Sequence, residues 1–144
     1  MLRCYLLAMC SGASLDQHSN NVSLFNLVEQ INVPAGASPP PGGTLPLEIH
    51  AYLLVDGDDL GTSFEMRFAL RADSGLETYS DIFKHRSVTA RYRTRTLGLP
   101  APPVLGSYEL RLDLRREGTG EWQRSSAAWP LLVVEAPEQT PVVH

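Results

Sequence analysis

The sequence has no hydrophobic run long enough to cross a membrane, and it has little cysteine. Its longest apolar stretch, Cys4 to Cys10, falls far short of the ~18 residues that a spanning helix needs. Cys4 and Cys10 are the only two cysteines, and in an extended chain they lie roughly 20 Å apart, beyond disulfide reach. We expect two buried thiols in a cytoplasmic protein, with export or lipid anchoring through Cys10 as the alternative.

Positive charge is also limited. Twelve basic residues stand against sixteen acidic ones, and the net charge is −4, so the charge balance does not favour nucleic acid or an anionic membrane as a partner. With 43% apolar and 19% charged residues, the composition is that of a folded protein. The 144 residues suit one domain, which we place at residues 1–136 and follow with a flexible tail at residues 137–144.

Sequence signatures of catalysis and metal binding are missing. There is no phosphate-binding loop, dinucleotide fingerprint or nucleophile elbow, and no histidine or cysteine pair has metal-ligand spacing. The one acidic cluster is Asp56, Asp58 and Asp59, and the twelfth position of a calcium loop beginning at Asp56 would be Arg67 instead of glutamate. We therefore expect no catalytic residue, no cofactor and no metal, with these aspartates as the only metal candidates.

Alternation of apolar and polar residues is the main positive signal. In residues 106–118, Tyr108, Leu110, Leu112 and Leu114 alternate with charged or polar side chains. That period of two predicts a strand with one face in a core and the other in water.

The same rhythm recurs along the chain. Strands are predicted at residues 3–10, 47–55, 63–72, 76–83, 87–96, 122–128 and 131–135, separated by turns and by proline-rich connections at residues 33–46 and 97–105. Residues 22–31 favour a strand, although their leucine and valine spacing also allows a helix. The sequence predicts an antiparallel β-sandwich of about 7–8 strands of the immunoglobulin-like, Greek-key type, with a small β-barrel as the alternative.

Two surface features are candidates for contact with a partner. Arg91, Arg93 and Arg95 form a row on one face of a predicted strand, and guanidinium groups suit phosphate or carboxylate ligands. We expect this row to pair instead with carboxylates on neighbouring strands and to protect an exposed edge. The carboxylates in question are Glu65, Glu109 and Asp113. Trp122, just after a glycine turn, is the candidate exposed aromatic contact.

The order of these elements resembles a family of small uncharacterised bacterial β-sandwich proteins. The matching segments are Cys4, Ser23–Val28, Pro46–Ile49, Gly106–Leu110 and Trp129–Val133. The resemblance covers about residues 3–135 and departs through a longer loop at Ala35–Thr44. It implies a β-sandwich and brings no catalytic residues.

These observations favour a non-catalytic interaction module. We expect it to bind an unidentified protein, or a second copy of itself, through loops or an edge strand, with neither nucleic acid nor a membrane as a partner. The alternatives are a small-ligand or carbohydrate-binding sandwich that uses Trp122, Tyr52 and Tyr79, and a hydrolase whose site has no recognisable motif.

Overall fold

The computed structural model describes residues 2–34, 44–118 and 120–136, which form ten β-strands and one short turn of 3-10 helix, η1. The elements are β1 (Leu2–Leu15), β2 (Val22–Leu27), β3 (Gln30–Val33), β4 (Thr44–Val55), η1 (Gly57–Asp59), β5 (Ser63–Ala72), β6 (Glu77–Tyr79), β7 (Phe83–Arg86), β8 (Arg91–Pro100), β9 (Gly106–Arg116) and β10 (Gln123–Glu135). No helix in the described part of the chain is long and apolar enough to span a membrane.

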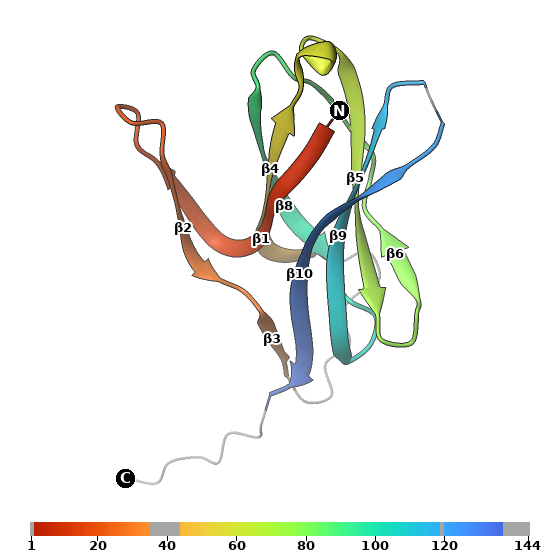
Figure 1. Cartoon of the computed structure of the whole chain (residues 1–144). Coiled ribbons are helices and arrows are strands. Elements are labelled where there is room, and N and C mark those ends of the chain that lie inside the picture. The colour runs from red at the N-terminus through yellow and green to blue at the C-terminus, as the bar shows by residue number, and fades with distance from the viewer. Residues whose placement is uncertain (1, 35–43, 119, 137–144) are drawn as a thin grey trace, which may run out of the picture.

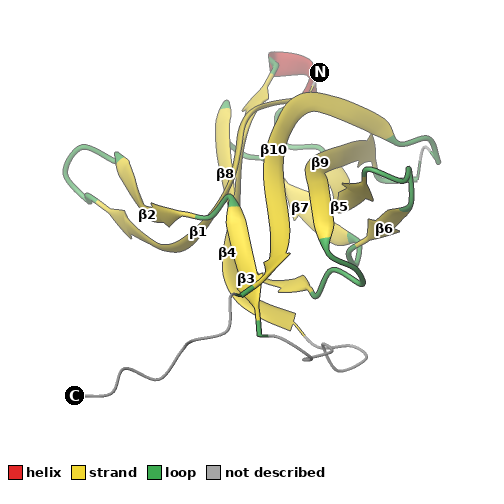
Figure 2. Ribbon diagram, turned by 90° about the horizontal axis from the view of Figure 1, so that it is seen from below, coloured by secondary structure: helices red, strands yellow, loops and turns green. Residues whose placement is uncertain are grey.

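The strands form two sheets that pack face to face (Figures 1 and 2). The four-stranded sheet has the order β2-β1-β4-β8, and the six-stranded sheet has the order β3-β10-β9-β5-β6, with β7 also paired to β5. The predicted β-sandwich is confirmed, although the six-stranded sheet is mixed because β3 runs parallel to β10. Among the described residues no pairing closes the sheets into a barrel. There are ten strands instead of 7–8 partly because residues 22–31 and 76–83 each contribute to two short strands.

The connections between the sheets follow the immunoglobulin-like Greek key. The chain passes from one sheet to the other at β2–β3, β3–β4, β4–β5, β7–β8 and β8–β9, and β9 lies between β5 and β10. At the β8–β9 crossing the Tyr108 hydroxyl donates to the backbone carbonyl of Val104 and accepts from its N–H. This is the tyrosine corner found near the start of the equivalent strand in immunoglobulin-like domains.

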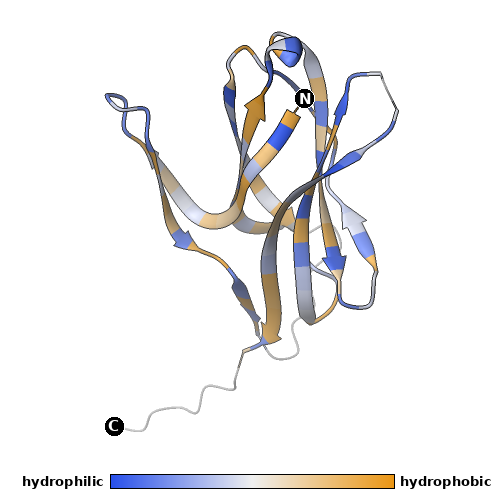
Figure 3. Ribbon diagram, viewed as in Figure 1, coloured by the Kyte–Doolittle hydropathy of each residue, from blue (hydrophilic) through white to orange (hydrophobic). Residues whose placement is uncertain are grey.

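The core lies between the inner faces of the two sheets. Tyr108, Leu110, Leu112 and Leu114 of β9 are all buried, as their alternation predicts. Figure 3 shows the same change between hydrophobic and hydrophilic residues along β9. The outer face of β9 departs from the prediction at Asp113, which is only 2% exposed. Cys4 and Cys10 are buried free thiols, as expected.

Three prolines lie in strands where the sequence predicted breaks, and one of them, Pro100, is the last residue of β8. Pro46 belongs to β4, at a register shift between Leu45 and Glu48 against β8. Pro130 lies within β10, just before the segment that pairs with β3. A bulge or an unpaired strand side tolerates the missing N–H, so neither Pro46 nor Pro130 ends its strand. The rest of the first proline-rich segment, residues 35–43, and the expected tail, residues 137–144, lie outside the described residues.

A hairpin projects from the side of the sandwich (Figures 1 and 2). The first part of β1 pairs with β4, whereas its last part, from Cys10 to Leu15, pairs with β2. We call residues 11–27 the β1–β2 arm. The side chain of Trp129 donates to the backbone oxygen of Val28 at 2.8 Å and so ties the base of the arm to β10. Because residues 22–31 contribute to β2 and β3, the strand interpretation of this segment is confirmed.

Candidate functional site

Three potential metal ligands meet on the outer face of the four-stranded sheet. Alternation along β4 puts Glu48, His50 and Tyr52 on the face opposite to the core residue Ile49. Antiparallel pairing of β1 with β4 sets Cys10 directly opposite Glu48. The ligand atoms of Cys10, Glu48 and His50 all lie within 4.8 Å of one another, and all three residues are buried. We call these three residues the Cys-Glu-His cluster.

The Glu48 carboxylate connects the members of this cluster. Its Oε2 lies 3.0 Å from His50 Nε2 and 4.0 Å from Cys10 Sγ. Its Oε1 accepts from Arg95 Nε of β8 at 2.9 Å. Hydrogen bonds from Arg95 and then from His50 hold the pKa of Glu48 below its usual value. The cluster therefore contains a buried carboxylate anion that is stabilised by a guanidinium group.

The cysteine of the cluster is not poised as a nucleophile. Burial raises the pKa of the Cys10 thiol, so the thiol keeps its proton at neutral pH. Reactive cysteines have the opposite environment, with a lowered pKa and some exposure. Cys10 is 0% exposed, so the cluster lacks the access that a substrate would need.

Tyr52 contributes an unpartnered polar atom beside the cluster. Its hydroxyl oxygen is buried, and no described residue offers it a hydrogen bond. Its ring lies edge-on to that of His50, with the centroids 6.5 Å apart, and the Arg93 guanidinium lies 5.4 Å from the ring centroid. A buried hydroxyl is usually hydrogen-bonded to protein or to an ordered water molecule.

Sequence reasoning missed this cluster. A search for metal-ligand spacing compares positions along the chain, whereas Cys10 meets Glu48 across two paired strands. The available signal was local: Glu48, His50 and Tyr52 occupy alternate positions and therefore share one face of a strand.

The arginine row lies on β8, the strand at the edge of the four-stranded sheet. Its expected pairing with Glu65, Glu109 and Asp113 is wrong, because β5 and β9 belong to the other sheet. Arg95 pairs with Glu48, and Arg93 donates to the backbone oxygen of Asn20 in the β1–β2 arm at 2.7 Å. The position on an edge strand agrees with the protective role expected for charged residues there.

The carboxylates of the six-stranded sheet have their own arginine partners. Asp113 accepts from Arg67 at 3.0 Å and from Arg124 at 2.9 Å. The carboxylate of Glu65 pairs with Arg115 at 2.8 Å. Burial alone would raise the pKa of Asp113, but the hydrogen bonds from Arg124 and Arg67 outweigh it and lower the pKa.

Trp122 lies over this charged network. The guanidinium carbons of Arg67 and Arg115 lie 4.6 and 4.0 Å from its ring centroid, and Arg67 also contacts the ring of Tyr79 at 3.9 Å. Such cation–π contacts stabilise the ring in place. A sugar that stacked on Trp122 would have to compete with an arginine.

The three candidate aspartates do not form a ligand cluster in the described structure. Asp59 is buried and pairs with Arg116 of β9, whereas Asp56 and Asp58 are exposed. Among the described residues the only group of three or more potential ligand side chains that could hold a cation is the Cys-Glu-His cluster, so these aspartates do not converge as a calcium site requires.

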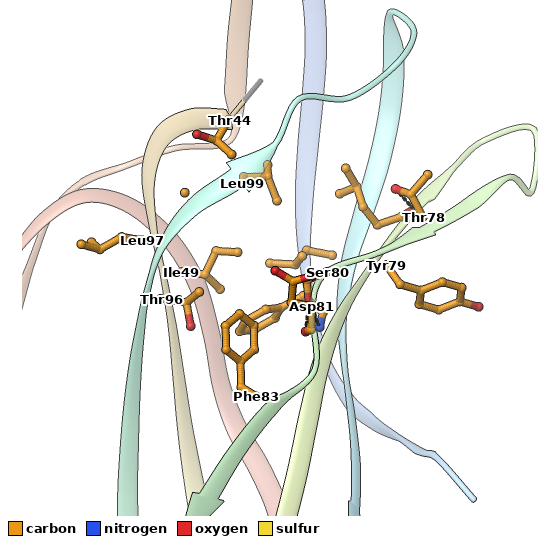
Figure 4. Close-up of a pocket in the computed structure, with 14 residues that line it drawn as sticks. Thr44, Ile49, Thr78, Tyr79, Ser80, Asp81, Phe83, Thr96, Leu97 and Leu99 are labelled. Carbon is orange, nitrogen blue, oxygen red and sulfur yellow. Dashed lines mark hydrogen bonds between the residues drawn. The ribbon is translucent and has the colours of Figure 1, made fainter. Parts of the chain in front are cut away.

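A cavity of about 210 Å³ opens between β8 and the segment that contains β6 and β7 (Figure 4). Its interior is apolar, with Ile49, Phe68 and Leu110, and hydroxyl groups such as those of Thr78 and Thr96 lie at its border. Typical ligand pockets have volumes of roughly 300–1,000 Å³, so this cavity is small for a ligand site. The ring of Tyr79, a candidate ligand contact, points away from the cavity in Figure 4.

The topology and the tyrosine corner define an immunoglobulin-like β-sandwich. No protein-family model matches the chain, and no curated protein is significantly similar to it. The resemblance to small bacterial β-sandwich proteins therefore rests on the order of strands and turns alone.

Proposed function

We propose that this chain is a non-catalytic interaction module that associates with a second copy of itself through the outer edge of β2. The observation that carries the proposal is the chemistry of β2, an edge strand that has no charged residue. An edge strand presents unpaired backbone groups that can pair with a strand of another chain.

The other edge strands are less suitable for pairing. β8 carries Arg91, Arg93 and Arg95, which oppose the approach of another strand. The β6 and β7 strands are only 3 and 4 residues long and carry charged side chains. β3 is uncharged, but it has 4 residues and its exposed side chains are the polar Gln30 and Asn32.

Apolar side chains are exposed on the β1–β2 arm. Leu15, Phe25 and Leu27 keep 54%, 53% and 53% of their surface in contact with solvent. The register puts Phe25 opposite Gly12, which offers no side chain to cover the ring. Association that covered these residues would contribute about 25 cal/mol per Å² of apolar surface.

The strand suits a symmetric partner. Two identical strands that pair antiparallel are related by a two-fold axis, so the same surface patch of each copy forms both sides of the interface. The six residues of β2 include no charge, and two copies therefore meet without like-charge repulsion. The paired sheets would form one continuous sheet across the dimer.

Sedimentation equilibrium over a range of protein concentrations tests the proposal, with the expected result a monomer–dimer equilibrium. We expect Phe25→Lys or Phe25→Glu alone to abolish the dimer by like-charge repulsion, and a mixture of the two variants to restore it as a heterodimer. Val88→Lys is the matched control, because Val88 is also an exposed apolar residue (72%) but lies outside the β1–β2 arm.

A monomer at all concentrations up to about 100 µM, well above a micromolar dissociation constant, would overturn the proposal. Equal loss of the dimer in the Val88→Lys variant would also overturn it. Far-ultraviolet circular dichroism of each variant confirms that the sandwich is still folded.

A further inference from the structure

We infer that the Cys-Glu-His cluster is a binding site for a divalent zinc-type cation, held by Cys10 Sγ, His50 Nε2 and Glu48 Oε2. This inference is independent of association through β2, because the cluster involves β1, β4 and β8 and not the outer edge of β2.

The set of ligands matches the preferences of zinc. Thiolate, imidazole and carboxylate are its three common protein ligands, and three of them leave a fourth position for water. Zinc bonds of 2.0–2.3 Å put neighbouring tetrahedral ligands roughly 3.4–3.6 Å apart. The distance from Cys10 Sγ to Glu48 Oε2, 4.0 Å, is slightly longer than that spacing. The distance from His50 Nε2 to Glu48 Oε2, 3.0 Å, is slightly shorter.

The strands hold the ligands in place. Cys10 pairs with Glu48, and His50 is opposite Ala8, whose small side chain leaves room for the imidazole. Arg95 binds only Oε1 of the Glu48 carboxylate and so orients Oε2 toward Cys10 and His50. Such outer hydrogen bonds orient the ligands in known metal sites.

The charges balance when the thiol loses its proton. The S–H bond of Cys10 breaks, a sulfur–metal bond forms, and the proton leaves to solvent. The Cys10 thiolate and the Glu48 carboxylate then neutralise the two positive charges of the cation. The Arg95 guanidinium remains close, but its side chain is 58% exposed and therefore hydrated.

The Tyr52 hydroxyl lies beside the cluster without a partner among the described residues. It is buried, and the Tyr52 ring lies edge-on to that of His50 with the centroids 6.5 Å apart. A water molecule in the fourth position on the cation would provide this missing partner.

Cobalt is the probe for the experiment, since Co²⁺ reports its ligands in the absorption spectrum. Protein freed of metal with a chelator is titrated first with Co²⁺ and then with Zn²⁺, which should displace it. We expect one Co²⁺ per chain, a thiolate-to-cobalt charge-transfer band, and the visible bands of a four-coordinate ion.

Variants locate the site. Cys10→Ser should abolish the charge-transfer band, and His50→Gln should weaken Zn²⁺ binding by at least about 100-fold. Arg95→Lys, which changes an outer contact, should weaken it by about 10-fold. Cys4→Ser is the matched control, because Cys4 is the other buried thiol and its sulfur donates to the backbone oxygen of Leu6, with no carboxylate or imidazole of the described residues as a partner. This variant should bind Co²⁺ and Zn²⁺ as the original chain does.

Two results would overturn the inference. One is the absence of a charge-transfer band when the folded original chain is saturated with Co²⁺. This test uses the unmodified chain, so it does not depend on whether any variant folds. The other is a band that survives Cys10→Ser but is lost with Cys4→Ser. Circular dichroism distinguishes loss of the site from loss of the fold.

Discussion

Asp113 shows how a single residue can depart from a strand pattern. Its place in the alternation of β9 assigns it to the solvent side, yet it is 2% exposed. Arg67 and Arg124 both donate to it, and Trp122 lies over the Arg67 guanidinium. A buried charge is tolerated only when it is paired, so these two arginines are the condition for its burial.

His85 makes the stability of the protein depend on pH. Its ring stacks on that of Phe64 with centroids 5.7 Å apart, and its Nδ1 lies 2.9 Å from the Tyr92 hydroxyl oxygen. Burial lowers the pKa of His85 because it disfavours the charged imidazolium. The folded state therefore binds the proton less readily than the unfolded chain, in which the pKa is about 6.5.

The sign of the effect follows directly. The contribution of His85 to the free energy of unfolding is fully present above about pH 6.5. It is lost as the pH falls through the lower pKa that His85 has in the folded state. We expect the free energy of unfolding in urea to be smaller at pH 5.5 than at pH 7.5. His85→Gln should reduce this difference, whereas an unchanged difference in that variant would contradict the assignment. His18→Gln, at an exposed histidine, is the control.

At the scale of the strand, the local pattern was enough to predict most elements. Period-two alternation marks β5 and β9, because each side chain's direction is set by its own position in the strand. The Cys-Glu-His cluster could not be predicted in this way. Its formation depends on which residue of β1 faces which residue of β4, and that register is fixed by the packing of the whole sheet.

The same limit explains the errors in the predicted charge pairs. The sequence shows that β8 and β9 both carry charged outer faces, but it does not show that they lie in different sheets. The prolines were misjudged for a related reason. Proline is tolerated where a strand lacks a neighbour or forms a bulge, and both conditions depend on partners far along the chain.

The connection from β8 to β9 depends on one hydroxyl group. Tyr108 is buried in the core, and its hydroxyl both donates to and accepts from the backbone of Val104. We expect Tyr108→Phe to destabilise the protein by about 1–2 kcal/mol, since the ring still packs but the hydrogen bonds are lost. Tyr79→Phe, at an exposed tyrosine, should change stability by less than about 0.5 kcal/mol. Equal effects of both variants in urea denaturation would refute the role of the corner.

At the scale of the molecule, stability should be unevenly distributed. The sandwich strands bury one face in a shared core, whereas the β1–β2 arm projects from it and exposes its apolar side chains. The arm is held at its base by Trp129 and near its turn by Arg93. Few buried contacts and exposed backbone hydrogen bonds are the conditions under which a segment opens locally without unfolding of the whole.

Native-state hydrogen exchange can measure this difference residue by residue. At low protein concentration, amides of β9 such as that of Leu112 should exchange only through global unfolding. Amides near the arm's turn, such as that of Val22, should exchange through a smaller opening free energy. If two copies pair through β2, raising the concentration should protect the amides of its outer edge and leave β9 unchanged. Equal protection of arm and core at low concentration would show that the arm opens only together with the sandwich.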